Sequence, residues 1–211
     1  RILRSLFTQA PDNRCIYCSS NNENHMKKVA LSLLGMTAFL TICAFTLMPP
    51  KSPEYIGSKS CKGCHNSEKG GKVFAKWQKT DHANAFKTLM TPEADKIAKE
   101  KGYDTKAAET DFCLDCHVTG MNVDGAKHSK KFKNDEGVGC ESCHGPAKDY
   151  KTKHNKPEKI EDAKKAGLQL PKVADGSAEK QCVSCHNKTS PTYKPFDMAK
   201  KWALIKHELP K

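Results

Sequence analysis

The sequence contains few of the large apolar side chains that normally build a protein core. After residue 48, only 21 of 163 residues, about 13%, are Leu, Ile, Val or Phe, which is below the roughly 20% under which a highly charged chain is disordered. Ordering each backbone residue costs about 1–2 kcal/mol, and so little apolar burial does not offset that cost. The composition therefore excludes a self-sufficient hydrophobic core. Either the chain is disordered, or a non-protein group supplies the missing apolar mass.

Cysteine, by contrast, is abundant: the chain has 11, and eight of them form four copies of the pattern C-x-x-C-H. On one helical turn, positions i, i+3 and i+4 share a face, so two thiols can bond to one macrocycle while the imidazole faces its iron. The pattern is the attachment signal of haem c, and it predicts four covalently attached haem c groups. The predicted attachment residues are Cys61, Cys64, Cys113, Cys116, Cys140, Cys143, Cys182 and Cys185, and the predicted iron ligands are His65, His117, His144 and His186.

Other uses of paired cysteines explain this pattern less well. Structural zinc sites contain C-x-x-C pairs, as do dithiol redox motifs, but neither requires His directly after each second Cys. With 9 His in 211 residues, His follows all four pairs by chance with a probability of roughly 3 × 10⁻⁶, so the pattern indicates haem. A fifth pair, Cys15 and Cys18, is followed by Ser19 and receives no role.

The remaining histidines are candidates for the second axial position of each iron. Four lie outside the motifs in the part of the chain after residue 48, equal to the number of irons. His is a common second ligand, and Met is the usual alternative. We therefore expect ligands among His82, His154, His207 and His128, with Met90, Met121 and Met198 as less favoured alternatives. His128 is the weakest candidate because it lies in a Gly-containing loop between lysines.

The N-terminal part resembles targeting sequence. Met26, Lys27 and Lys28 precede an apolar run at 29–47, as the charged and apolar regions of an export signal do. The run is long enough to be a retained membrane anchor instead, and Cys43 could suggest lipidation, although Ile42 before it fits poorly. We expect residues 1–25 to be an upstream segment, 26–50 a signal peptide or anchor, and 51–211 a tetrahaem domain located in the periplasm.

The secondary structure is expected to be mainly α, with short helices and long loops wrapped around the haems and little or no sheet. Apolar residues at helical spacing favour a helix at 72–90. Thr91 and Pro92 start a second helix that Gly102 ends, and residues 158–166 form a third helix, ending at Gly167. The glycine-containing stretch 118–139 reads as a loop. Residues 196–209 place Met198, Trp202, Ile205 and Leu209 on one stripe.

The chain resembles the tetrahaem cytochrome c-554 family. The resemblance is carried by 61–65 followed by 77–83, by 115–118, by the fourth motif with its tail, and above all by the run 137–146. It implies a periplasmic electron carrier in which three haems have two His ligands and one haem keeps an open position. It also implies that His154 serves the iron of His65, His82 that of His144, and His207 that of His186, while the haem of His117 is open. His128 lies in the loop after that motif, so stoichiometry alone would close the open site.

Electron transfer between redox proteins is the function that these features favour. One alternative is an enzyme that reduces a small nitrogen compound at an open haem, and another is a subunit of an extracellular haem filament. Cytochrome c nitrite reductases commonly replace a motif His by Lys, and this chain keeps all four. The net charge of +12 includes lysine clusters at 127–133 and 148–165, which either solvate the surface or steer acidic partner proteins. Nucleic acid is not expected as a partner of an exported haem protein.

Overall fold

The computed structural model describes residues 51–208. The predicted segments 1–25 and 26–50, with Cys15, Cys18 and Cys43, lie outside the described residues, as does Leu209 of the predicted stripe. Within 51–208, every helix is too short or too polar to cross a membrane.

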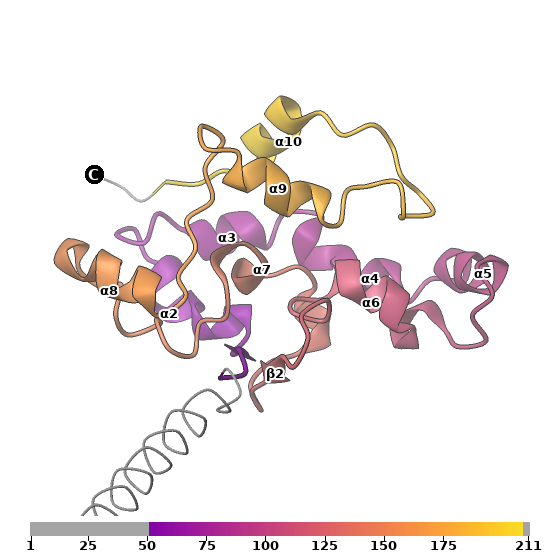
Figure 1. Ribbon diagram of the computed structural model, residues 1–211, viewed down its shortest axis with the longest axis horizontal. Helices are drawn as coiled ribbons and strands as arrows, with labels where there is room; N and C mark the ends of the chain where they lie inside the picture. Colours follow the sequence, from indigo (N-terminus) through magenta and orange to yellow (C-terminus); the bar gives the residue numbers. More distant parts are fainter. Residues whose placement is uncertain (1–50, 209–211) are drawn as a thin grey trace, which may run out of the picture. The chain divides into compact units, whose positions relative to one another are not determined.

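Short helices joined by long loops make up the described chain (Figure 1). This architecture confirms the predicted mainly α fold class with little sheet. In chain order the elements are β1 (Glu54–Tyr55), η1 (Ser58–Ser60), α2 (Lys62–His65), α3 (Val73–Trp77), η2 (His82–Asn84), α4 (Ala85–Thr88), α5 (Pro92–Glu100), η3 (Ala107–Glu109), α6 (Asp111–His117), β2 (Lys127–His128), η4 (Asn134–Glu136), α7 (Cys140–His144), η5 (Pro157–Lys159), α8 (Ile160–Lys165), α9 (Ser177–Val183) and α10 (Met198–Ile205).

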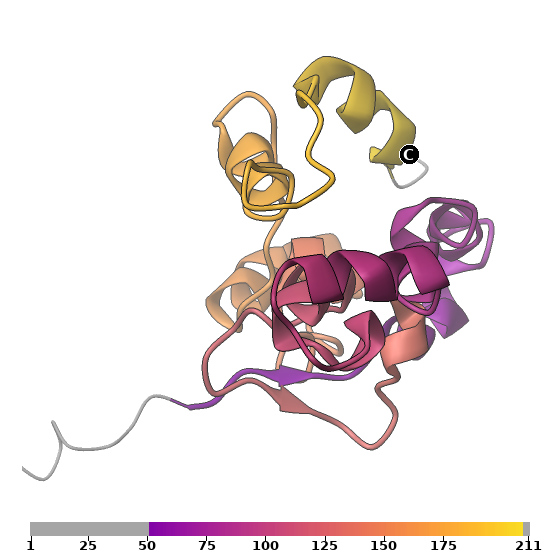
Figure 2. The ribbon, with the colours of Figure 1, turned by 90° about the vertical axis from the view of Figure 1, so that its right-hand side faces the viewer.

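The elements of residues 52–208 are spread along one axis. Helix α7 lies near the middle of Figure 1, with α8 toward one end and α5 toward the other. Helices α9 and α10 lie on one side, and the two strands lie on the opposite side, an arrangement that Figure 2 shows from a second direction.

Helix boundaries that depend on local chemistry follow the sequence. The Thr91 side chain accepts a hydrogen bond from the Ala94 N–H at 3.2 Å, and Pro92 is the first helical residue of α5. Proline suits this position because its missing N–H would have no partner there. Gly102, with a φ of 87°, follows the helix, and Gly167, with a φ of 103°, follows α8.

Segments fixed by distant contacts differ from the sequence-based expectation. The helix expected at 72–90 is divided into α3, η2 and α4, because the Val138 N–H donates to the His82 carbonyl at 2.9 Å. The Trp77 Nε1–H donates in turn to the Val138 carbonyl at 3.0 Å. The stretch 118–139, expected to be a loop, carries η4 and also β2, which forms a two-residue parallel ladder with β1.

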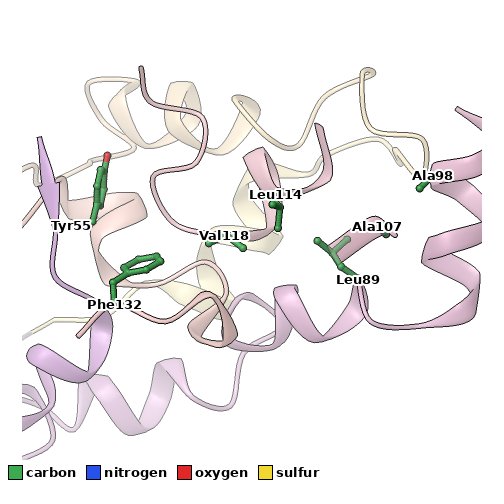
Figure 3. Packing of buried hydrophobic residues seen from close by; sticks show 7 residues of the cluster. All are labelled: Tyr55, Leu89, Ala98, Ala107, Leu114, Val118 and Phe132. Carbon is green, nitrogen blue, oxygen red and sulfur yellow. The ribbon is translucent and has the colours of Figure 1, made fainter. Parts of the chain in front are cut away.

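Apolar side chains form two small clusters instead of one continuous core. The larger joins β1, α4 to α6 and the loop after α6; its members, labelled in Figure 3, are Tyr55, Leu89, Ala98, Ala107, Leu114, Val118 and Phe132. The smaller consists of Ile56, Ala147, Tyr150, Ala163 and Leu168. Several members are alanines, and no large side chain of the described residues is more than 98% buried. The sparse packing agrees with the shortage of apolar residues in the composition.

Candidate haem attachment sites

Each C-x-x-C-H motif occupies one turn of helix. The second and third motifs lie within α6 and α7. In the first, the His65 N–H donates to the Cys61 carbonyl at 3.1 Å, and in the fourth the His186 N–H donates to the Cys182 carbonyl at 2.9 Å. These i to i+4 bonds place both thiols and the imidazole of each motif on one face, as attachment to a single macrocycle requires.

Thiols of the first motif lie close to those of the third, and thiols of the second lie close to those of the fourth. The Cys61 thiol forms a hydrogen bond with Cys140, and Cys116 forms one with Cys185. The eight motif cysteines are free of disulfides. The bond to Cys116 lowers the pKa of Cys185 to about 7, whereas the bond to Cys140, together with burial, raises the pKa of Cys61.

A longer-range interaction links the two pairs of motifs. Cys143 interacts electrostatically with Cys182 and Cys185, and burial is the main cause that raises its pKa to about 11. The four attachment sites therefore lie in a series: first motif, third, fourth, second.

Three motif histidines face a histidine from outside the motifs. The ring centres of His65 and His154 are 5.9 Å apart, with ring planes 8° from parallel. The other two pairs are His82 with His186, at 6.0 Å and 45°, and His144 with His207, at 5.7 Å and 64°. In every pair, one partner comes from a C-x-x-C-H motif and the other is one of the predicted second ligands.

The spacing of these pairs fits an iron between the two rings. With a metal–nitrogen bond of about 2 Å on each side, the centres of two coordinating imidazoles lie roughly 6 Å apart. Ordinary aromatic contacts cover the same range, so the distance alone does not identify a site. The identity of the partners adds support, because three pairs combine a motif histidine with a non-motif histidine.

Hydrogen bonds orient four of the predicted ligands by the same ring nitrogen. Nδ1 faces a backbone carbonyl oxygen at 2.7–3.2 Å in each case, and this leaves Nε2 available to iron, the arrangement usual for metal-binding histidines. The four contacts are His117 with Ala85, His144 with Gln169, His154 with Tyr150 and His207 with Ile205.

Burial also favours the form of the ring that binds a metal. Desolvation is the main cause that lowers the pKa of four histidines in the paired sites: His65, His82, His144 and His186. A lowered pKa keeps the imidazole neutral near pH 7, and the neutral ring is the ligand.

The observed neighbours differ in two cases from those that the resemblance implied. His154 lies beside His65, as expected. His82, however, lies beside His186 instead of His144, and His207 lies beside His144 instead of His186. The ring contacts therefore favour other partners for these two histidines than the resemblance implies. Sequence distance carries no information about this exchange, because loops of different length bring each ring to its neighbour.

The structure does not place His128 beside any motif histidine. Its Nε2 lies 3.1 Å from the Thr119 carbonyl oxygen, and its ring packs against Tyr55 at 5.6 Å and Phe132 at 4.2 Å between ring centres. In His128 it is therefore Nε2, the nitrogen left available in the other histidines, that faces a carbonyl oxygen. This geometry argues against His128 as an iron ligand.

His117 differs from the other motif histidines. Its Nδ1 lies 2.7 Å from the Ala85 carbonyl oxygen and 3.2 Å from the Thr88 hydroxyl. None of the ring contacts among residues 51–208 joins His117 to another histidine, although His117 contributes electrostatically to the lowered pKa of His186.

Two buried carboxylates near the motifs were not anticipated from the sequence. Glu141, inside the third motif, is only 2% exposed and accepts hydrogen bonds from the backbone N–H groups of Ile56, Gly57 and Ala147. Glu136, 5% exposed, accepts from the backbone N–H of Ser58. Through these hydrogen bonds, both carboxylates fix the segment that precedes the first motif beside the chain at the third motif. The only sequence signal is their position in or beside the run 137–146.

Comparisons with known proteins identify relatives of this chain. The family described as "Cytochrome c554 and c-prime" matches residues 60–145, which include the first three motifs. Cytochrome c-554 of Nitrosomonas europaea is 30% identical over 171 residues, covering 76% of this chain and 69% of that protein. Multiheme cytochrome MtrA of Shewanella baltica is 35% identical over 120 residues, covering 50% of this chain and 32% of that protein. No solved structure matches the chain significantly.

The repeated motif turns and these similarities define a multihaem c-type cytochrome, a class of electron-transfer proteins that bind haem c covalently. Within that class, the chain belongs to the cytochrome c-554 family.

Proposed function

We propose that this protein binds four haem c groups and passes single electrons between redox proteins outside the cytoplasmic membrane. The observation that carries the proposal is that three motif histidines each face a histidine from outside the motifs: His65 with His154, His186 with His82, and His144 with His207. Haem iron bound at each site supplies a one-electron redox centre. Thiols of the first and third motifs, and of the second and fourth, interact directly, which supports electron exchange between neighbouring haems.

The histidine pairs support six-coordinate iron at three sites. We assign His65 with His154, His186 with His82, and His144 with His207 as the axial ligands, from the ring contacts and the orientation of Nδ1. A pair of imidazoles leaves no position for a substrate, which suits a carrier. The eight motif cysteines would hold the porphyrins by thioether bonds.

The proposal is tested by measuring haem content and reduction. Four haems per chain are expected from the pyridine haemochrome absorbance and from the mass of the intact protein. Stoichiometric reduction by dithionite should take four electrons per chain. Fewer than four haems, or irons that stay oxidised while others are reduced, would contradict it.

The site of His117 supports a second candidate function, redox chemistry on a small molecule. No histidine among residues 51–208 lies beside this ring, so we propose that its iron keeps an open position. A high-spin ferric signal in electron paramagnetic resonance, and binding of carbon monoxide after reduction, are expected. Wholly low-spin iron with no carbon monoxide binding would remove this candidate and leave the carrier function intact.

Export is part of the same proposal. The signal or anchor at 26–50 and the upstream segment 1–25 are inferred from sequence alone, with residues 51–211 forming the tetrahaem domain. Cell fractionation and N-terminal sequencing of the purified protein test this. A haem-loaded protein that begins after residue 47 is expected if the segment is removed, and a membrane-bound protein if it is retained.

A further inference from the structure

A basic groove is lined by residues of both strands. The strands themselves lie on the side opposite α9 and α10 (Figures 1 and 2). The groove has a volume of about 600 Å³ and is lined by Lys127, Lys130, Lys131 and Lys148 together with Glu54, Ile56, Ser60, His128 and Ser129. Without His128, the formal charge of these residues is +3. The groove is separate from the histidine pairs, since His128 belongs to none of them.

The fold brings two lysine clusters that are separate in the sequence to this one place. Three of the lysines come from the cluster at 127–133 and Lys148 comes from the cluster at 148–165. The strand pairing of Glu54 with Lys127 fixes one wall. The other wall is held by the ion pair between Lys148 and Glu54, with 3.0 Å between Nζ and Oε1. Strand pairing and this ion pair therefore bring lysines from both clusters to one surface.

The floor of the groove lies next to the first and third motifs. Ser60 directly precedes Cys61, and the Ile56 N–H donates to the buried carboxylate of Glu141 within the third motif at 3.0 Å. The Cys61 and Cys140 thiols of these motifs are in contact. A protein seated on the groove would therefore lie beside the first and third motifs.

The character of the lining favours a protein surface over a small bound ion. All four lysine side chains are exposed. Lys148 already pairs with Glu54, and Lys127, Lys130 and Lys131 are accessible to a large partner. Carboxylates on the surface of such a partner match these lysines in charge.

We propose that this groove is the docking site for an acidic face of a redox partner, with carboxylate side chains of the partner entering between Lys127, Lys130 and Lys131. The proposal rests on the proposed function, since it places electron exchange beside the first and third motifs. Charge complementarity at such a site speeds encounter by about 10- to 1000-fold and falls with ionic strength.

The test compares two triple variants of the haem-loaded protein that lose the same charge. One variant, K127Q/K130Q/K131Q, removes groove lysines and leaves the Lys148–Glu54 pair. The matched control, K99Q/K101Q/K106Q, removes three exposed lysines on α5 and in the loop after it. Hexaglutamate peptide serves as the carboxylate probe in isothermal titration calorimetry. The dianion of iron(II)–EDTA serves as a reductant in stopped-flow kinetics at low and high salt.

The groove variant is expected to weaken peptide binding and slow reduction by about tenfold at low salt, and the control by less than about twofold. Equal losses in both variants would mean that only net charge matters and would overturn the proposal. Loss of binding to phosphatidylglycerol vesicles in the groove variant, with peptide binding unchanged, would assign the groove to a membrane surface instead. Haem content measured on the same samples separates these results from failure of the proposed function.

Discussion

The regions around the first and third motifs and around the second motif are built in different ways. In the first region, buried carboxylates and histidine pairs hold the chain: Glu141 accepts three backbone N–H groups, and His65 and His144 each face a second histidine. Around His117 the larger apolar cluster lies close by, with Leu114 in α6 and Val118 directly after it. No second histidine of residues 51–208 contacts the ring.

This difference shows two ways for a chain with few apolar residues to fix a cofactor site. Where an iron would have two protein ligands, the metal joins segments distant in sequence, and little side-chain packing is needed. Where an iron would have only one protein ligand, side-chain packing has to position the motif, and one coordination position of the iron would stay open. The following predictions test that contrast.

The largest effect is expected from preparing the chain without haem. The region of the first and third motifs should lose its structure, because two histidine pairs meet there and only the smaller apolar cluster lies nearby. Residual amide protection should be confined to about residues 85–118, where the larger cluster lies. Hydrogen exchange and thermal circular dichroism measure this. A cooperative transition with protection across all described residues would mean that protein packing alone is sufficient.

Replacing a predicted second ligand should convert one iron completely from low spin to high spin. This is expected for His154→Ala, His207→Ala and His82→Ala in electron paramagnetic resonance, with recovery of the low-spin signal when imidazole is added. His128→Ala is the matched control and should leave the spectrum unchanged, because the ring hydrogen-bonds through Nε2 to Thr119.

The same variants test the histidine partners that the ring contacts favour. In paramagnetic proton NMR, the iron affected by His82→Ala should be the one bound to His186, which lies 6.0 Å from His82 between ring centres. An effect on the iron of His144 would restore the partners that the family resemblance implied. New high-spin iron in His128→Ala would show that His128 does bind iron.

The sequence was most informative where chemistry is local and least informative where it depends on distant contacts. The motif turns and the Thr91 cap of α5 follow from short patterns. Counting the histidines outside the motifs gave four candidate ligands, and three of them face a motif histidine. The division of 72–90 into shorter helices follows from hydrogen bonds to Val138, more than 50 residues away. The same limit applies to the partners of His82 and His207 and to the lysine groove. Each requires knowing which loops meet, and loop lengths alone do not specify this.

A smaller effect is expected from Glu141→Gln, which tests how much the buried carboxylate stabilises the region of the first and third motifs. The carboxylate accepts from Gly57 and Ala147, each at 2.7 Å, through different oxygens. An amide group replaces one oxygen by a donor, so one buried N–H loses its acceptor. The expected cost is about 2–3 kcal/mol of the free energy of unfolding. Denaturant unfolding of the haem-loaded protein measures it. Glu109→Gln, at an exposed position, is the control and should change little.

The smallest effect concerns the pH dependence of stability through Glu136. Burial raises the pKa of this carboxyl above the ordinary value of 4.5, and the N–H groups of Ser58 and Lys59 and the Lys59 charge offset only part of this. The charged groups that face it are Lys59, with 4.0 Å between Nζ and Oε1, and Asp135. The Glu136 Oε1 atom has no hydrogen-bond partner among the described residues.

Because the folded pKa is the higher one, the folded protein holds this proton over a range where the unfolded chain has lost it. The contribution of Glu136 to stability should therefore fall as pH rises from about 4.5 through the folded pKa, and should be constant above it. Glu136→Gln should reduce the dependence of stability on pH in that range. The pH dependence that remains should come from Glu141, because burial also raises the pKa of that carboxyl. Denaturant midpoints measured for both proteins at matched pH values test this. If the free energy of unfolding changes with pH equally in the variant and the original protein, then Glu136 Oε1 is solvated or bound in the folded state. Burial of this carboxyl would then impose no pH dependence on stability.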